Sequence, residues 1–315
     1  MYIRPKDLKQ ETAEKLRSLT CKPGHILLIY FAISLGVSLL LSLMQIYISD
    51  QAAQVGGLDG LQTQAIWDSV CSILELAFSV LSPIWGFGLT FVTLQFARGE
   101  ESHPRCLTAG FHRFGRGIGL YLLSSLLASL VSFIAVFVGI LLMALLVNFD
   151  ELTSVLAPFE QLAAENPALM EDPAFLSTLP WDQVISTMLL PLVLMVLFIV
   201  GLSVAMSYLL RLASYYIMDA PGVNPALAII RSCIGVGKNL KTFLMLDLSH
   251  WWFFLLMVLL TLFSMIPGLP GMVNLGTWGA FLWQLTYALG VCALYWWKGP
   301  QVMTTYALAY DKLKN

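Results

Sequence analysis

The sequence predicts an all-α fold: an integral membrane helical bundle of six transmembrane helices, with both termini in the cytoplasm and interfacial helices on the cytoplasmic side. Three observations predict this fold. Hydrophobic residues make up 58% of the 315-residue chain and charged residues only 11%, whereas about a quarter of the residues in a soluble domain are charged. Long apolar stretches follow one another along the chain. The lysines and arginines fall only in every second gap between these stretches.

The apolar stretches are long enough to cross a bilayer as helices. About 20 residues, at roughly 1.5 Å per residue, span a hydrocarbon core that is about 30 Å thick. The first stretch exceeds the roughly 7 to 15 apolar residues of a secretory signal and has no clear cleavage site, so we expect it to remain as an anchor. We predict membrane spans at residues 25–48, 66–96, 118–147, 184–210, 243–266 and 280–297.

The 17 basic residues orient the predicted helices. Six precede the first span, four follow the second, four follow the fourth and three follow the sixth. Because short loops rich in lysine and arginine stay in the cytoplasm, these gaps and both termini are predicted to be cytoplasmic. Acidic residues accumulate in or beside the other gaps, above all in a predicted external loop at residues 149–183.

The whole chain, residues 1–315, is predicted to form a single membrane domain that begins with a cytoplasmic amphipathic segment at residues 1–24. Within this segment, residues 5–19 are expected to form a short charged helix. It lies either flat on an anionic membrane surface or in solvent as a lead-in helix, and the sequence leaves both interpretations open.

A second cytoplasmic segment, residues 211–242, is a basic loop. Apolar residues recur at helical spacing in residues 226–241, which predicts an interfacial helix beneath the bundle. Asn224 is expected to cap this helix, with Pro225 in its first turn.

The second predicted span is too long for one straight crossing, and it contains Pro83 followed by Gly86 and Gly88. Proline removes a backbone donor and clashes with the preceding turn, so we expect a kink or a break. A broken membrane helix must border protein or a water-filled cavity. The segment is therefore either a cavity wall or a packing kink whose glycines admit a neighbouring helix.

Ionisable residues at membrane depth are candidates for function because an unpaired charge there is costly. Glu75 lies about ten residues into the second span, with no lysine or arginine at its depth, so a protonated side chain is expected. Asp247 and His250 are three residues apart and share a helix face, so they are expected to form a polar cluster with Ser249. These four residues are the candidate intramembrane site.

Basic residues of the inner loops are candidates for contact with anionic lipid headgroups. A lysine or arginine near such a surface contributes about 1 kcal/mol to binding. The candidates are Arg105, Arg113, Arg116, Arg211, Lys238 and Lys241.

The usual catalytic motifs, such as HExxH, GxSxG and the Walker loop, do not occur in the sequence. The four histidines are scattered over separate segments, which disfavours a metal centre. We therefore expect no catalytic residues, no cofactor, no metal and no nucleic-acid partner.

Several short stretches resemble a bacterial polytopic membrane family known as domain of unknown function 975. The similar residues are YYIMDAP at 215–221, Ala228, Ser232, LDLS at 246–249, Trp251, Trp252, the N-terminal Arg4, Leu8, Lys9, Ala13 and Leu16, and the loop from Arg98-Gly99-Glu100 to Gly110-Phe111. A glycine and a lysine that the family tends to carry after Ser232 stand displaced here, at Gly237 and Lys238. The resemblance implies a six-helix inner-membrane protein and supplies no activity.

Two classes of function fit these observations. In the first, the protein is a non-enzymatic accessory or lipid-interacting factor of the plasma (inner) membrane, whose partners are anionic lipids and other membrane proteins. In the alternative, it is a small-solute or ion transporter or channel with a polar path near Glu75 and Asp247. A transporter commonly shows two matched halves, and no internal repeat is evident. We therefore favour the first class, and place a membrane enzyme third.

Overall fold

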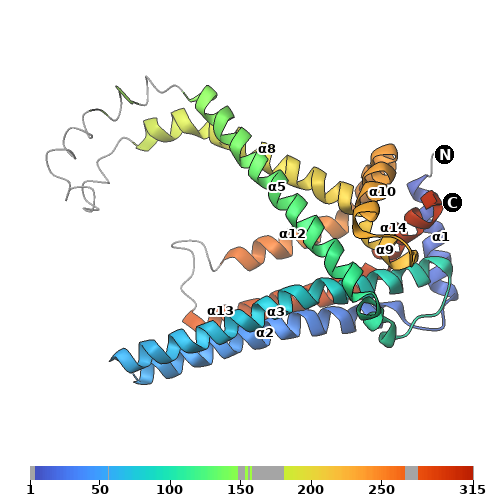
Figure 1. Ribbon diagram of the computed structural model, residues 1–315, viewed down its shortest axis with the longest axis horizontal. Coiled ribbons are helices and arrows are strands. Elements are labelled where there is room, and N and C mark those ends of the chain that lie inside the picture. Colours follow the sequence, from blue (N-terminus) through green and yellow to red (C-terminus); the bar gives the residue numbers. More distant parts are fainter. Residues whose placement is uncertain are drawn as a thin grey trace. The chain divides into compact units, whose positions relative to one another are not determined.

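The structure is a computed structural model that describes residues 4–55, 57–147, 153–154, 157, 181–266 and 276–314. Every regular element in these ranges is a helix (Figure 1). The chain divides into two compact units, one formed by Met1–Leu123 with Arg211–Asn315 and the other by Ser124–Leu210. We describe each unit by itself. The predicted external loop, residues 149–183, lies almost wholly outside the described residues.

Long apolar helices run through the first unit, and α2 (Pro23–Val55) packs between α3 (Gly57–Arg98) and α13 (Gly276–Trp297). The rings of Phe31 on α2 and Tyr295 on α13 stack with centroids 3.8 Å apart. Against the other side of α13 packs α12 (Trp251–Met265), and Trp283 donates its indole N–H to the carbonyl oxygen of Phe263 over 2.7 Å. This carbonyl lies in the last turn of α12 and also accepts the backbone N–H of Ile266.

Helix α3 continues through Pro83, so the predicted break in this helix is wrong. The short segment of η1 (Pro104–Thr108) and α4 (Ala109–His112) packs directly on the stretch around Pro83. A Cβ atom added to Gly88 would lie 1.7 Å from the carbonyl oxygen of Leu107, and one added to Gly110 would lie 2.0 Å from that of Ile84. The glycines therefore admit a neighbouring segment, which is the second of the two interpretations of this stretch.

The fifth predicted span, residues 243–266, is not one continuous helix. Helix α11 (Leu240–Ser249) ends at His250, and α12 leaves at 71° to it. His250 caps α11 through its backbone N–H and has φ −109° and ψ 19°, so it follows neither helix. No proline or glycine marks this break, which is why the apolar pattern did not predict it.

The second unit consists of most of α5 (Phe114–Leu146) together with α8 (Trp181–Leu210). These helices correspond to the third and fourth predicted spans. Gly139 of α5 lies against α8, since a Cβ atom added there would lie 2.7 Å from Cγ of Met195. Small residues allow such close approach of helices in membranes.

Four helices in the described part of the chain are long and apolar enough to cross a membrane, and the bent pair of α11 and α12 would make a fifth. The four segments are Pro23–Ile48, Gln64–Arg98, Phe114–Leu146 and Ile185–Asp219. The sixth predicted span, now α13, is not among them. Its tryptophans and tyrosines and Gln284 make it less apolar than the others.

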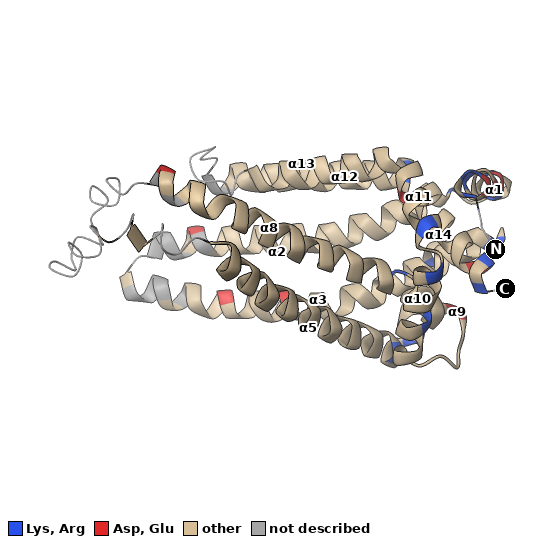
Figure 2. Cartoon of the chain, turned by 90° about the horizontal axis from the view of Figure 1, so that it is seen from above, with Lys and Arg blue, Asp and Glu red and all other residues tan. Residues whose placement is uncertain are grey.

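Short helices gather at one end of the first unit, and we call this region the basic end. It comprises α1 (Pro5–Ser18), η1, α4, α9 (Ala213–Asp219), α10 (Pro225–Lys238), α11 and α14 (Gly299–Lys314). Figure 2 shows the lysines and arginines clustered there, beside both chain ends. All 17 of them belong to the first unit.

Two short helices of the basic end were predicted from the sequence. Helix α1 matches residues 5–19, and it packs against α3, α11 and α14, which neither interpretation of this segment anticipated. Helix α10 matches the predicted interfacial helix, and the side chain of Asn224 caps it by accepting the N–H of Leu227 over 2.8 Å.

Helix α14 was not predicted, although it is the most buried of the short helices. Its residues from Val302 to Tyr310 are largely enclosed by α1, α2, α3 and α13. It is too short and too polar to register as a membrane span, so the search for long apolar stretches passed over it.

Candidate functional site

Arg211 and Asp247, which were predicted for two different sites, form an ion pair. The guanidinium Nη1 of Arg211 lies 3.0 Å from each carboxylate oxygen of Asp247. Tyr306 of α14 donates its hydroxyl to the same carboxylate, and the guanidinium of Arg211 lies 3.9 Å from the centre of the Tyr306 ring. Three elements thus meet at one carboxylate, and both charged groups are neutralised within the fold.

Ser249 and His250 do not join Asp247 in the expected polar cluster. The hydroxyl of Ser249 donates to the carbonyl oxygen of Leu246 over 2.7 Å. The imidazole of His250 is buried, and its Nε2 atom has no hydrogen-bond partner within the described residues. The side chains of Asp247, Ser249 and His250 therefore have different partners and do not form one cluster.

Glu75 is paired with an uncharged side chain. Gln45 of α2 donates from its amide to Glu75 of α3 over 2.9 Å. Glu75 is 23 residues from the end of α3 at Arg98, or roughly 35 Å at 1.5 Å per residue. Asp247 lies at the basic end with other partners, so the two carboxylates have no common set of contacts. A transport path near both of them stays a prediction from the sequence.

Arg113 and Arg116 bind the end of α9. Arg113 donates to the carbonyl oxygens of Ile217, over 2.7 Å, and of Met218. Arg116 donates to the carbonyl oxygens of Ala220 and Pro221. Carbonyls at the end of a helix lack partners within it and carry partial negative charge. Both arginines therefore hold the fold together, in addition to any contact that they make with lipid.

A second charged cluster ties the end of α3 to α9 and α14. Arg98 lies 2.7 Å from Asp219 and 2.9 Å from Asp311, while Lys314 lies 2.5 Å from the other oxygen of Asp219. Tyr310 donates to that oxygen over 3.0 Å. Burial, together with the negative charge of Asp219, raises the pKa of Tyr310, so its hydroxyl stays protonated as a donor.

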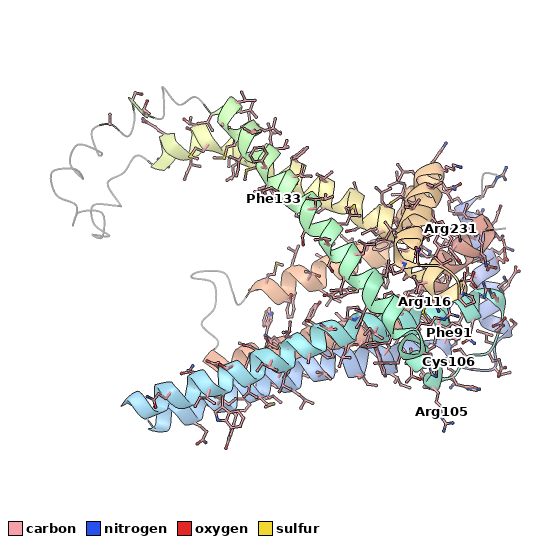
Figure 3. The ribbon with its side chains drawn as sticks, in the orientation of Figure 1. Phe91, Arg105, Cys106, Arg116, Phe133 and Arg231 are labelled. Carbon is pink, nitrogen blue, oxygen red and sulfur yellow. The ribbon has the colours of Figure 1, made fainter. Side chains whose placement is uncertain are left out.

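The remaining lipid-contact candidates are exposed. Arg105, Lys238 and Lys241 all lie on the surface of the basic end, as does Arg231. Figure 3 shows Arg105 and Arg231 extending away from the ribbon on different elements. On α10 and the start of α11, apolar side chains are exposed beside these cations, and they are Ile230, Ile234, Leu240 and Leu244.

A pocket of about 350 Å³ lies at the break between α11 and α12, and we call it the α11–α12 pocket. Ser249 and His250 line it at the break, and Lys9 of α1 lines another side. Lys298 and Gln301, at the junction of α13 and α14, close a third side. The pocket therefore brings two lysines and a histidine from separate parts of the chain to one place.

A family model described as "Protein of unknown function (DUF975)" matches residues 1–315, the whole chain. The chain belongs to this family. No curated protein and no solved structure matches it. Membership of the DUF975 family confirms the resemblance drawn from residues 215–221 and 246–249, and these two stretches contribute Asp219 and Asp247 to the two charged clusters.

The partners of these two aspartates in the DUF975 chain include residues that the sequence did not single out. Tyr306, Tyr310 and Asp311 all lie on α14 and all contact one of the two clusters. Tyr306 and Tyr310 are four residues apart and therefore share a helix face, and this was the available signal. It stayed unused because α14 itself was not predicted.

Proposed function

We propose that this DUF975 chain is a multi-pass protein of the bacterial plasma membrane with six spans and both termini in the cytoplasm. It acts as a non-enzymatic accessory factor that binds anionic lipid headgroups at its basic end. The observation that carries the proposal is the gathering of all 17 lysines and arginines in one unit, on or beside the short helices and at the adjoining ends of its apolar helices. Basic segments of membrane proteins are retained on the cytoplasmic side, where anionic lipids attract them.

The count of six spans follows from treating the bent pair of α11 and α12 as one broken span and α13 as another. Helix α13 packs along both α2 and α12, and both of these neighbours are strongly apolar. A helix that packs along two membrane helices can cross the bilayer beside them in spite of its lower hydropathy.

The lipid contact is supported by the mixed surface of α10 and α11. Exposed Ile230 and Ile234 alternate with the exposed cations Arg231 and Lys238. A helix of this composition lies in the membrane interface, with its apolar residues towards the acyl chains and its cations at the headgroups. Other membrane proteins are further candidate partners of the same surface.

Reporter or thiol-labelling experiments test the sidedness. In a cysteine-free variant, a cysteine at Asn315 is expected to react only with reagents that reach the cytoplasm, and a cysteine at Glu165 only with reagents outside. Labelling of the two positions from the same side would contradict the proposed topology.

Lipid enrichment tests the function. We expect the full chain, extracted with its native lipids, to be enriched several-fold in anionic over zwitterionic lipids. A combined Arg105→Gln, Lys238→Gln and Lys241→Gln variant is expected to lose most of this enrichment. The matched control exchanges each of these residues for the other basic residue and keeps the charge. Equal enrichment in all three proteins would reject a role for these cations.

A further inference from the structure

The α11–α12 pocket has charged groups on one side and apolar groups on the other. Lys9, Lys298, Gln301 and His250 supply its polar lining, and Trp252 and Leu256, in the first two turns of α12, belong to its apolar lining. Because α12 is one of the most apolar helices of the chain, this wall leads from the basic end towards the membrane-spanning part of the unit. A ligand that fills the pocket must therefore be amphiphilic.

The two lysines of the pocket lack acidic partners. Neither Lys9 nor Lys298 forms an ion pair with any described residue. Lys9 donates one hydrogen bond, to the carbonyl oxygen of Ser249 over 2.7 Å, and an ammonium group has three hydrogens to donate. Burial, and then the positive charge of Lys298, lower the pKa of Lys9. The lysines are thus close enough to repel one another, and an anion between them would relieve the repulsion.

His250 adds a donor or acceptor that is buried and unused. Its side chain is only 7% exposed, and its Nε2 atom has no partner among the described residues although the residue lines the pocket. A buried polar atom without a partner costs about 1–3 kcal/mol. The pocket also borders the first turn of α12, where the helix dipole favours an anion.

We propose that the α11–α12 pocket binds one anionic phospholipid, with its phosphate between Lys9, Lys298 and His250 and its acyl chain along Trp252 and Leu256. This inference rests on the proposed placement of the basic end at the membrane. It goes further in naming one site and one ligand class, whereas the exposed cations attract lipids without a defined position. The phosphate chemistry alone would also suit a soluble phosphate ester, but the apolar wall selects a lipid.

Native mass spectrometry of the full chain in detergent tests the site. With a few molar equivalents of phosphatidylglycerol, the parent protein is expected to retain one lipid, and with phosphatidylcholine none. Lys298→Gln is expected to weaken retention about fivefold, as the removal of one headgroup cation predicts. Leu256→Trp fills the apolar part without changing the charge, and is expected to weaken retention as well.

The controls separate a defined site from general attraction. Lys298→Arg keeps the charge and is expected to retain the lipid. Arg17→Gln removes one exposed cation from the last turn of α1, outside the pocket and apart from the lipid-contact residues named above, and is expected to change retention less than about twofold. A monodisperse size-exclusion profile, required of each variant, excludes unfolding as the cause of any loss.

Each other result overturns a stated part of the proposal. Equal losses in Arg17→Gln and Lys298→Gln would overturn the pocket and leave the general lipid contact standing. Displacement of the lipid by millimolar inorganic phosphate would overturn the lipid assignment in favour of a soluble ligand. A parent protein that shows no preference for phosphatidylglycerol over phosphatidylcholine would overturn the proposed function together with the site.

Discussion

Tyr306 donates its hydroxyl to Asp247 while its ring lies beneath the guanidinium of Arg211, so one tyrosine contacts both members of an ion pair. Helix α14 contributes this tyrosine, and the two charged residues come from the end of α8 and from α11. The pair is half-buried, and the tyrosine shields it from water. The phenol group of Tyr306 therefore contributes to the stability of the basic end.

Tyr306→Phe tests this dependence. The change keeps the ring beneath Arg211 and removes one hydrogen bond to a charged group, so we expect the free energy of unfolding to fall by about 1.5–3 kcal/mol. Thermal or denaturant unfolding in detergent measures the loss. Tyr47→Phe is the matched control, because Tyr47 is 65% exposed on α2, and it should leave stability unchanged. Equal stability of the parent and both variants would contradict the role of the hydroxyl.

Asp219→Asn is expected to destabilise the protein more than Asp311→Asn. Asp219 accepts from Arg98, Lys314 and Tyr310, and its side chain is only 6% exposed. Asp311 forms an ion pair with Arg98, and its side chain is 24% exposed. Removing one partner of a fully buried pair costs about 3–5 kcal/mol and an exposed pair contributes about 0–1 kcal/mol. Because Arg98 and Lys314 are 34% and 44% exposed, the loss from Asp219→Asn is expected between these limits. Unfolding measurements that rank the two variants in the opposite order would contradict this assignment.

Gly88→Ala is expected to separate η1 from α3. The added Cβ atom would lie 1.7 Å from the carbonyl oxygen of Leu107, so the backbone must move. Overpacking of this kind costs about 1–3 kcal/mol, and more where backbone is displaced. Gly36→Ala, on α2, adds a Cβ atom that meets nothing within 4 Å and should not destabilise the protein. The midpoints of thermal unfolding of Gly88→Ala and Gly36→Ala, each compared with that of the parent, test the packing of η1 on α3.

The contact between α1 and α14 is expected to weaken in acid. Burial opposes ionisation of Glu11, but hydrogen bonds from Lys312 and Lys15 outweigh it and lower the pKa of Glu11 from 4.5. A lowered carboxyl pKa stabilises the folded state above the unfolded pKa, and this stabilisation is lost as the pH falls through the folded pKa. The stability difference between the parent and Glu11→Gln should thus be constant from pH 7 to about 5 and shrink below pH 4.5. A difference that stays constant down to about pH 3 would contradict the ion pairs.

Local signals predicted the local structure. Asn224 followed by Pro225 marked the start of α10, because a cap needs only the residues next to it. Pro83 predicted a kink or a break, and α3 continues through it without a break, because a proline removes only one hydrogen bond of a membrane helix. The break at His250 carries no local signal in the sequence.

The contacts of the candidate site could not be predicted from the sequence because they join segments that are far apart along the chain. Arg211 and Asp247 are 36 residues apart, and Arg98 and Asp311 are 213 apart. The position of Asp247 in an apolar stretch indicated that its charge needs a partner. The sequence could not select Arg211 from the other basic residues of the basic end. The α11–α12 pocket likewise depends on a bend and on a helix, α14, that the apolar pattern did not predict.

The pairing of α1 with α14 sets an order for assembly on the ribosome. Helix α1 is synthesised first, yet Lys312, which contacts its Glu11, is among the last of the described residues to emerge. Until residues 299–314 have left the exit tunnel, α1 lacks its main docking surface. Completion of the basic end therefore waits for the synthesis of α14, and a nascent chain arrested before Gly299 should leave α1 open to protease.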